Sequence, residues 1–338
     1  MRIFIIGAGA MGGLYGGMMA EGGADVTLID IRADHVAQIN AKGLAVSGLT
    51  GARTIAIPAA STIAGLPQAD VVFVQTDINA TRAAAETAAQ VLAPDGCAIT
   101  LQNGIGNVEI LSEVLGQERV LAGVSYHSAA LTGLGSLRHS SHSLEAKTWI
   151  GELDGRRSQR VDMIAAALSG GRLNPHVTDN ILGVLWGKLI HNCALNPICA
   201  VTGLRMGQMA RLPETDLMQS KILQEAIAVA VAKGITLAPN PDPMSYLKDY
   251  SRLKYTQPSM QQHMESGRQT EIDAINGAIV REAEAVGVPA PYNHAISLMI
   301  KGRESHMMAV LHETPPDWSA LEAAARQEAE KAYPKEVT

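Results

Sequence analysis

The feature that most constrains this chain is a glycine-rich hexapeptide, Gly-Ala-Gly-Ala-Met-Gly, at residues 7–12. It follows an apolar run at residues 2–6, which predicts a strand, and it opens a helical pattern at residues 11–22. In such a unit Gly7 makes the tight turn, Gly9 lets the backbone approach a pyrophosphate, and Gly12 lets the helix pack closely on the strand. The alternative, a glycine turn without a ligand, leaves this ordered strand, loop and helix unexplained. The residues expected to contact a dinucleotide are Gly7, Ala8, Gly9, Ala10, Met11 and Gly12.

An acidic residue stands where the second predicted strand ends. Asp30 closes the apolar run at residues 25–30. A carboxylate at this place accepts hydrogen bonds from the adenosine ribose hydroxyls, which favours NAD over NADP. Arg32 opposes that preference, because a nearby arginine can hold a 2′-phosphate. The alternative for Asp30 is a solvent-facing strand end.

The first half of the chain alternates short apolar runs with helical stretches. Continuous runs of valine, isoleucine and leucine are typical of central parallel strands that are covered on both faces. This alternation predicts an α/β, doubly wound Rossmann fold. Strands are expected at residues 2–6, 25–30, 44–48, 53–57, 70–75 and 97–101, with more within 119–151, and helices at 11–22, 34–42 and 79–92.

Long helical periods dominate the second half of the chain. They predict helices at residues 180–201, 213–234, 258–266, 270–287 and 290–312, followed by a charged tail helix. A chain of 338 residues suits two domains of roughly 150 residues each. The run Thr-Asp-Asn at 178–180 is a helix-capping pattern. We therefore expect a Rossmann domain over residues 1–178 and an all-α domain over residues 179–338.

Composition excludes several classes of partner. A net charge of −6 argues against nucleic acid or an anionic membrane surface, and no apolar run approaches the ~20 residues of a membrane span. Three cysteines without paired spacing do not form a disulfide framework, so we expect a cytoplasmic protein. His139 and His142 lack further ligands at metal-binding spacing, and no metal site is expected.

Lys188, Asn192 and Asn196 are spaced four residues apart in an otherwise apolar helical stretch. On a helix they form one polar stripe. Polar groups in such a helix must be hydrogen-bonded or face a cleft, and an exposed polar face is the alternative. A second polar cluster at residues 257–276 contains Ser259, Glu271 and Asp273, and by itself each of these residues is more typical of a helix cap or a surface charge than of a site.

These motifs, in this order, resemble those of the ketopantoate reductase family, the 2-dehydropantoate 2-reductases, over nearly the whole chain. They are the glycine loop, Gln-Asn-Gly at 102–104, the stripe from Lys188, Pro-Ser-Met at 258–260 and Gly-Arg-Gln-Thr-Glu-Ile-Asp at 267–273. The resemblance implies a Rossmann domain followed by a helical domain like that of 6-phosphogluconate dehydrogenase. It also implies an active site in the cleft between them and a homodimer formed through the helical domain.

The resemblance assigns roles by position. Lys188 would be the general acid in ketone reduction, donating a proton to the carbonyl oxygen as hydride arrives, and Glu271 would contact the substrate hydroxyl and help to hold Lys188. A cation with a transferable proton suits the negative charge that builds on that oxygen. The resemblance implies substrate contacts by Asn103, Asn192, Asn196 and Ser259, and further cofactor contacts by Asp30, Thr76 and Asn103.

Two positions depart from the family pattern. Members that use NADPH carry basic residues after the second and fourth strands, whereas this chain has Asp30 after the second strand and Asp77 where a lysine is typical. Two carboxylates would repel a 2′-phosphate, so we expect NADH to be favoured over NADPH. His263 stands where the family often has an aspartate, and its alternative is a surface helix position.

The implied function is NAD(P)H-dependent reduction of a 2-keto acid, with 2-dehydropantoate to pantoate as the leading reaction. One alternative is an NAD-dependent dehydrogenase of another 2-hydroxy acid or a β-hydroxy acid. The stretch at residues 267–273 favours the 2-keto acid reductase over the β-hydroxy acid dehydrogenase. An alternative of another class is a non-catalytic NAD-binding sensor, which gives no reason for Lys188 and Glu271 to converge.

Overall fold

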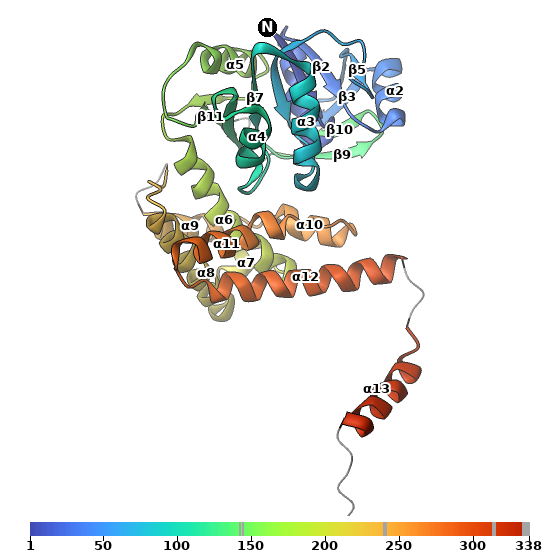
Figure 1. Cartoon of the computed structure of the whole chain (residues 1–338), viewed down its shortest axis with the longest axis vertical. Helices are drawn as coiled ribbons and strands as arrows, with labels where there is room; N and C mark the ends of the chain where they lie inside the picture. The colour runs from blue at the N-terminus through green and yellow to red at the C-terminus, as the bar shows by residue number, and fades with distance from the viewer. Residues whose placement is uncertain (142, 144, 239–241, 313–315, 333–338) are drawn as a thin grey trace, which may run out of the picture.

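A computed structural model describes the chain except for residues 142, 144, 239–241, 313–315 and 333–338. The strands of the first half form one body, and the helices of the second half form another (Figure 1). Helix α6 (Ile181–Thr202) leads from the first body into the second. No helix in the described part of the chain is both long and apolar enough to cross a bilayer.

An eight-stranded sheet organises the first body, in the order β12-β11-β8-β7-β6-β1-β2-β5. Neighbouring strands run parallel from β5 to β8, β11 is antiparallel to β8, and β12 is parallel to β11. The bounds are β1 (Arg2–Ile6), β2 (Asp25–Ile29), β5 (Ala59–Ala60), β6 (Ala69–Val74), β7 (Leu92–Thr100), β8 (Val120–Ser125), β11 (Thr148–Glu152) and β12 (Pro175–Val177).

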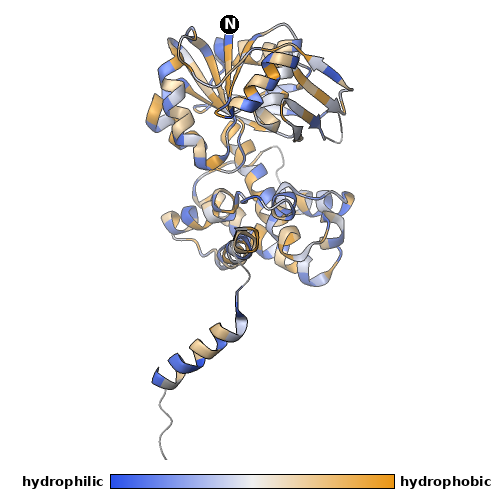
Figure 2. Ribbon diagram, turned by 90° about the vertical axis from the view of Figure 1, so that its right-hand side faces the viewer, coloured by the Kyte–Doolittle hydropathy of each residue, from blue (hydrophilic) through white to orange (hydrophobic). Residues whose placement is uncertain are grey.

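Helices cover both faces of this sheet, as the continuous apolar runs predict. Ile3 and Ile5 of β1 lie in one core with α1 (Ala10–Glu21) and α5 (Gln159–Gly170). Phe4 and Ile6 lie in a second core with α3 (Thr81–Val91), α4 (Asn107–Leu115) and the start of α6. Figure 2 shows the apolar colouring along these strands. The predicted Rossmann fold is therefore confirmed.

A smaller sheet, in the order β4-β3-β10-β9, packs beside α1. It contains β3 (Leu44–Gly48), β4 (Arg53–Ile55), β9 (Ala129–Gly133) and β10 (Ser136–His139), and α2 (Ala33–Lys42) lies between β2 and β3 along the chain. The strands expected within 119–151 are thus divided between two sheets. His139 is buried at the end of β10, 3.3 Å from the ring of His127, whereas His142 lies outside the described residues.

The second body packs around α6, which contacts α8 (Pro213–Ala232), α10 (Ser259–Glu265) and α12 (Pro291–His312). The remaining helices are α7 (Met206–Met209), α9 (Pro243–Leu253), α11 (Asn276–Val286) and α13 (Trp318–Ala332). The tail helix α13 lies apart from the body in Figure 1. This helical second body confirms the predicted all-α fold.

The prediction of one helix over 270–287 is wrong. A short 3₁₀ helix, η3 (Ile272–Ala274), is followed by a break at Ile275, and α11 begins only at Asn276. The carbonyl of Ala274 accepts a hydrogen bond from the Ile105 backbone of the first body at 3.3 Å. The break thus lies at a contact between the two bodies. The periodicity of apolar residues along the sequence cannot predict such a contact.

The three glycines of the loop meet different surroundings. Gly7 has a φ of +97°, and a Cβ there would lie 2.7 Å from the Gln75 carbonyl oxygen. A Cβ at Gly12 would lie 1.8 Å from the Gly7 carbonyl oxygen, whereas a Cβ at Gly9 would have nothing within 4 Å. Close packing therefore excludes a side chain at Gly7 and at Gly12, whereas Gly9 faces open space at the N-terminus of α1.

We predict that Gly12→Ala lowers the free energy of unfolding by about 1–3 kcal/mol, because its methyl group forces the loop away from α1. Gly9→Ala is the matched control and should change it by less than about 1 kcal/mol, since its backbone is accessible to alanine and the space is open. Denaturant midpoints of the two variants give the comparison, and equal midpoints would contradict the close packing at Gly12.

Candidate active site

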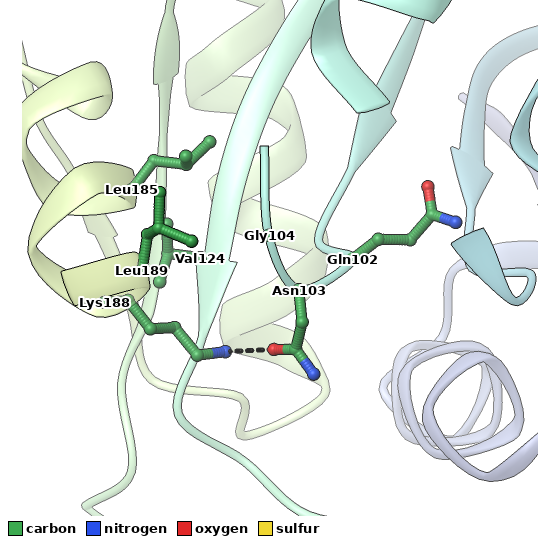
Figure 3. A pocket seen from close by; sticks show the side chains of 7 residues that line it. All are labelled: Gln102, Asn103, Gly104, Val124, Leu185, Lys188 and Leu189. Carbon is green, nitrogen blue, oxygen red and sulfur yellow. Dashed lines mark hydrogen bonds between the residues drawn. The ribbon is translucent and has the colours of Figure 1, made fainter. Parts of the chain in front are cut away.

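Lys188 extends from α6 into the junction between the two bodies (Figure 3). Its ammonium donates to Asn103 Oδ1 at 2.8 Å and to the carbonyl oxygen of Ser125 at 2.6 Å. Both acceptors come from the first body, one after β7 and one at the end of β8. A residue of the helical body thus depends on strand ends of the other body for its partners.

Burial changes the acidity of this lysine. Removal of water from around the ammonium lowers the pKa of Lys188 to about 8, and the nearby carboxylate of Glu271 opposes the shift. Burial disfavours the charged form of an amine, whereas a neighbouring negative charge favours it. Lys188 can therefore both hold and release a proton near neutral pH, which is the property a general acid requires.

Asn103 lies between Lys188 and Glu271. Its Oδ1 accepts from the lysine, and its Nδ2 donates to Glu271 Oε2 at 3.1 Å. Within the described residues no direct ion pair joins Lys188 to Glu271. Burial raises the pKa of Glu271, and the hydrogen bond from Asn103 and the charge of Lys188 pull it back.

The loop that carries Asn103 is fixed at both sides. Gln102 Nε2 donates to the Thr76 carbonyl at 2.8 Å and to Thr81 Oγ1 at 3.0 Å, which ties the loop to the end of β6. Gly104 has a φ of +80°, and a Cβ there would lie 2.4 Å from the Ala274 carbonyl oxygen. The glycine of Gln-Asn-Gly therefore allows the close approach to η3 that brings Asn103 to Glu271.

A small pocket opens at this junction. Figure 3 shows Lys188 and Asn103 pointing toward each other, with apolar side chains from α6 and β8 beside them and Gln102 turned away. The ammonium therefore sits against an apolar surface, where hydrogen bonds are stronger than in water. The lining residues are Gln102, Asn103, Gly104, Val124, Leu185, Lys188 and Leu189.

Asn192 and Asn196 follow Lys188 along α6 as the spacing predicts. Asn192 is half-buried and Asn196 is only 6 % exposed. Neither side chain has a hydrogen-bond partner among the described residues, so both amides are free to bind a ligand. Ser259 begins α10, which packs on α6, but within the described part of the chain its exposed side chain makes no hydrogen bond to Lys188 or Glu271.

After β2, the side chain of Asp30 is bound to its own neighbours. Its carboxylate accepts from the Ala8 backbone at 2.9 Å and from the Arg32 guanidinium at 3.0 Å through both oxygens. Burial opposes the charge, yet the hydrogen bonds from Arg32 hold the pKa of Asp30 below its usual value. Because Asp30 is only 8 % exposed, the alternative of a solvent-facing strand end is wrong.

This end of the molecule fits a dinucleotide. Open space lies at Gly9, and α1 begins there with twelve residues and no acidic side chain in its first turn. Free backbone N–H groups and the positive end of the helix dipole suit a pyrophosphate. Ala8 is buried, Ala10 and Met11 are half-buried, and Thr76 follows β6 beside Gly7.

His263 is half-buried on α10, so the surface-position alternative does not describe it. Its Nδ1 has no hydrogen-bond partner within the described chain. Burial and the charge of Arg268 lower the pKa of His263, and Asp77 opposes them. The charge of Asp77, the second of the two departing carboxylates, therefore acts on this histidine.

Two residues at the site carry no signal in the sequence. Ser125 contributes its backbone carbonyl, which any residue type could provide. The ring of Tyr126 lies 5.7 Å from the Lys188 ammonium and adds a cation–π contact. Only the path of the chain after β8 brings both of them to the lysine.

Comparison with known proteins identifies relatives of the whole arrangement. Residues 3–155 match the family model described as ketopantoate reductase PanE/ApbA, and residues 180–304 match its C-terminal counterpart. A 2-dehydropantoate 2-reductase of Pyrococcus horikoshii is 33% identical over 309 residues, which cover 90% of this chain and 98% of that protein. Its counterpart in Archaeoglobus fulgidus is 31% identical, with the same coverage.

Solved structures agree with this relationship. A PanE/ApbA family ketopantoate reductase from Ralstonia eutropha superposes with a TM-score of 0.82 at 30% identity, over 91% of this chain and 99% of the other. A D-mandelate dehydrogenase, solved with NADH and anilino(oxo)acetate, superposes with a TM-score of 0.82 at 26% identity and the same coverage. With both of its halves matched by the family models, this chain belongs to the ketopantoate reductase family.

Proposed function

We propose that this protein reduces 2-dehydropantoate to pantoate, with Lys188 as the general acid. The observation that carries the proposal is the desolvated ammonium, held by Asn103 and Ser125 beside the small pocket. Residues 1–178 would hold the dinucleotide and residues 179–338 would supply the lysine. The named activity of the Pyrococcus horikoshii relative supports the substrate.

The chemistry follows from the hydrogen bonds of the lysine. An ammonium has three N–H donors, and two of those on Lys188 are used by Asn103 and Ser125. The third can bind a substrate carbonyl oxygen. When bound, a reduced nicotinamide supplies a hydride to the carbonyl carbon. The C=O π electrons move to the oxygen, and that oxygen takes a proton from Lys188 to become the hydroxyl.

The other polar side chains complete the proposed site. Asn192 and Asn196 present unpaired amides one and two turns further along α6, where they would hydrogen-bond the substrate. Ser259 would contact the substrate carboxylate from the start of α10. Glu271 would contact the product hydroxyl and support the charge of Lys188 through Asn103.

A second proposed reaction is oxidation or reduction of another 2-hydroxy or 2-keto acid. The observation in its favour is the similarity to a D-mandelate dehydrogenase that was solved with NADH, together with Tyr126 beside Lys188. An assay of 2-keto acids, followed by NADH absorbance, separates the two reactions. A higher kcat/KM for another 2-keto acid than for 2-dehydropantoate would replace the leading assignment. A β-hydroxy acid is the remaining member of this class of alternatives.

A non-catalytic NAD-binding sensor would not need a desolvated lysine beside a small pocket. It would also not need the two unpaired amides of Asn192 and Asn196. The geometry around Lys188 therefore favours an enzyme.

We also propose a homodimer formed through the helical domain, to be checked by sedimentation equilibrium of the full chain. A monomer at micromolar concentration would rule out this assembly.

We predict that Lys188→Ala lowers kcat at least 10²-fold, because a positioned acid contributes roughly 10²–10⁴-fold. The dissociation constant for NADH should stay within about threefold, since the lysine does not contact the glycine loop. Stopped-flow turnover and fluorescence titration measure the two quantities. Lys42→Ala, at the exposed end of α2, is the matched control and should leave both unchanged. Full turnover by Lys188→Ala would exclude the proposed acid.

The pH dependence of reduction should report Lys188. The protonated amine is the reactive form, so kcat/KM for ketone reduction should fall as pH rises through about 8, while the reverse oxidation should increase there. Glu271→Gln removes the charge that raises the lysine pKa, so its alkaline limb should move to lower pH. An unchanged limb in this variant would contradict the electrostatic link.

We propose NADH as the preferred cofactor. The hydrogen bonds to Asp30 raise the pKa of the Arg32 guanidinium, burial opposes the shift, and the charges of Asp30, Asp34 and Asp77 raise it further. Since Arg32 is already paired with Asp30, a 2′-phosphate would enter a region of excess negative charge.

We predict a kcat/KM at least tenfold higher with NADH than with NADPH in steady-state kinetics. Asp77→Lys should narrow this ratio, because it replaces an exposed negative charge with a positive one in the same region. A clear preference of the unmodified protein for NADPH would refute the assignment.

A further inference from the structure

The carbonyl of Ser125 sets the direction in which Lys188 can donate. The lysine binds it at 2.6 Å and binds Asn103 Oδ1 at 2.8 Å. The three N–H groups of an ammonium point to the corners of a tetrahedron, so two fixed acceptors determine where the third hydrogen points. A displacement of the Ser125 carbonyl would therefore turn the proton that is offered to the substrate.

Ser125 is itself held by a residue of the helix that follows the glycine loop. The hydroxyl of Tyr15, on α1, donates to Ser125 Oγ at 2.7 Å. The His127 backbone N–H donates to the same oxygen at 3.1 Å. The side chain of Ser125 is thus clamped from two directions, directly beside the carbonyl that Lys188 uses.

The hydroxyl of Tyr15 is buried without any access to solvent. It also lies 2.7 Å from Thr148 Oγ1, which donates to the Leu173 carbonyl at 2.8 Å. A buried hydroxyl costs free energy unless it is hydrogen-bonded, and phenylalanine would fill the same core position without that cost. The phenol avoids this cost through its partners, and it thereby ties α1 to the ends of β8 and β11.

We propose that Tyr15 is a positioning residue that orients the Lys188 ammonium through Ser125. Through it, the helix that begins at the dinucleotide loop is connected to the proton donor by one side-chain hydrogen bond and one backbone residue. The inference rests on the proposed role of Lys188 as the acid. It assigns to Tyr15 no contact with substrate or cofactor.

The test is Tyr15→Phe in the full chain, which removes one oxygen and keeps the ring. We expect kcat to fall about five- to tenfold, the loss of roughly one hydrogen bond. The KM for the 2-keto acid should change by less than about twofold. The alkaline limb of the kcat profile should move to lower pH, because the displaced carbonyl no longer stabilises the charged amine.

Thr148→Val is the control for stability, because it removes the other neighbour of the same phenol, together with the Thr148 hydrogen bond to the Leu173 carbonyl, and keeps the donation from Tyr15 to Ser125. It should lower the unfolding midpoint at least as much as Tyr15→Phe does, with kcat and the alkaline limb unchanged. Ser125→Ala should reproduce the effect of Tyr15→Phe, and the double variant should be no slower than either single variant. Tyr15→Phe with a wild-type kcat and limb, or Thr148→Val with the same loss as Tyr15→Phe, would overturn the positioning role.

Lys188→Ala separates this inference from the proposed function. If that variant is inactive and Tyr15→Phe behaves as the unmodified protein does, only the positioning role fails. If Lys188→Ala keeps full turnover, the proposed acid and the positioning role both fail. In the Lys188→Ala background, adding Tyr15→Phe should leave the residual rate unchanged, and a further fivefold loss would contradict an action through the lysine.

Discussion

The site depends on one buried cation and the two acceptors that hold it. Lys188 extends from the helical domain, and both of its hydrogen-bond partners, Asn103 and the Ser125 carbonyl, belong to the Rossmann domain. An amine that has lost its water needs such partners, or its charged form becomes too costly. The same two bonds therefore stabilise the proton on the lysine, leave one N–H for a substrate, and join the two domains at the place where the reaction would occur.

Asn103 gives the cation an indirect link to a carboxylate. A direct ion pair with Glu271 would hold the lysine pKa high and make the proton harder to release. With the amide between them, the carboxylate still raises the pKa, but burial dominates and the value stays near 8. The close approach that makes this possible depends on Gly104, where a side chain would collide with η3. A backbone feature thus brings the carboxylate close enough to affect the pKa of Lys188.

The end of the molecule that carries the glycine loop is organised differently, because its polar side chains are hydrogen-bonded to one another and to the backbone. The carboxylate of Asp30 accepts hydrogen bonds from the Ala8 backbone and from Arg32. It therefore helps to hold the glycine loop in place, and it leaves less of the positive charge of Arg32 for a phosphate. Tyr15 continues the same helix into the core and reaches Ser125. The helix that begins at the glycine loop is consequently linked to Lys188 through Ser125.

The sequence by itself determined the glycine loop, the sheet covered on both faces, the helical second half, and the shared face of Lys188, Asn192 and Asn196. Each of these depends on neighbours within a few turns or strand residues, and periodicity records such neighbours. Only the tertiary structure decided that helix 270–287 breaks at Ile275 and that the Ser125 carbonyl meets the lysine. Both result from contacts between segments more than sixty residues apart in sequence. Every residue type has a backbone carbonyl, so the sequence does not indicate which carbonyl will bind the lysine.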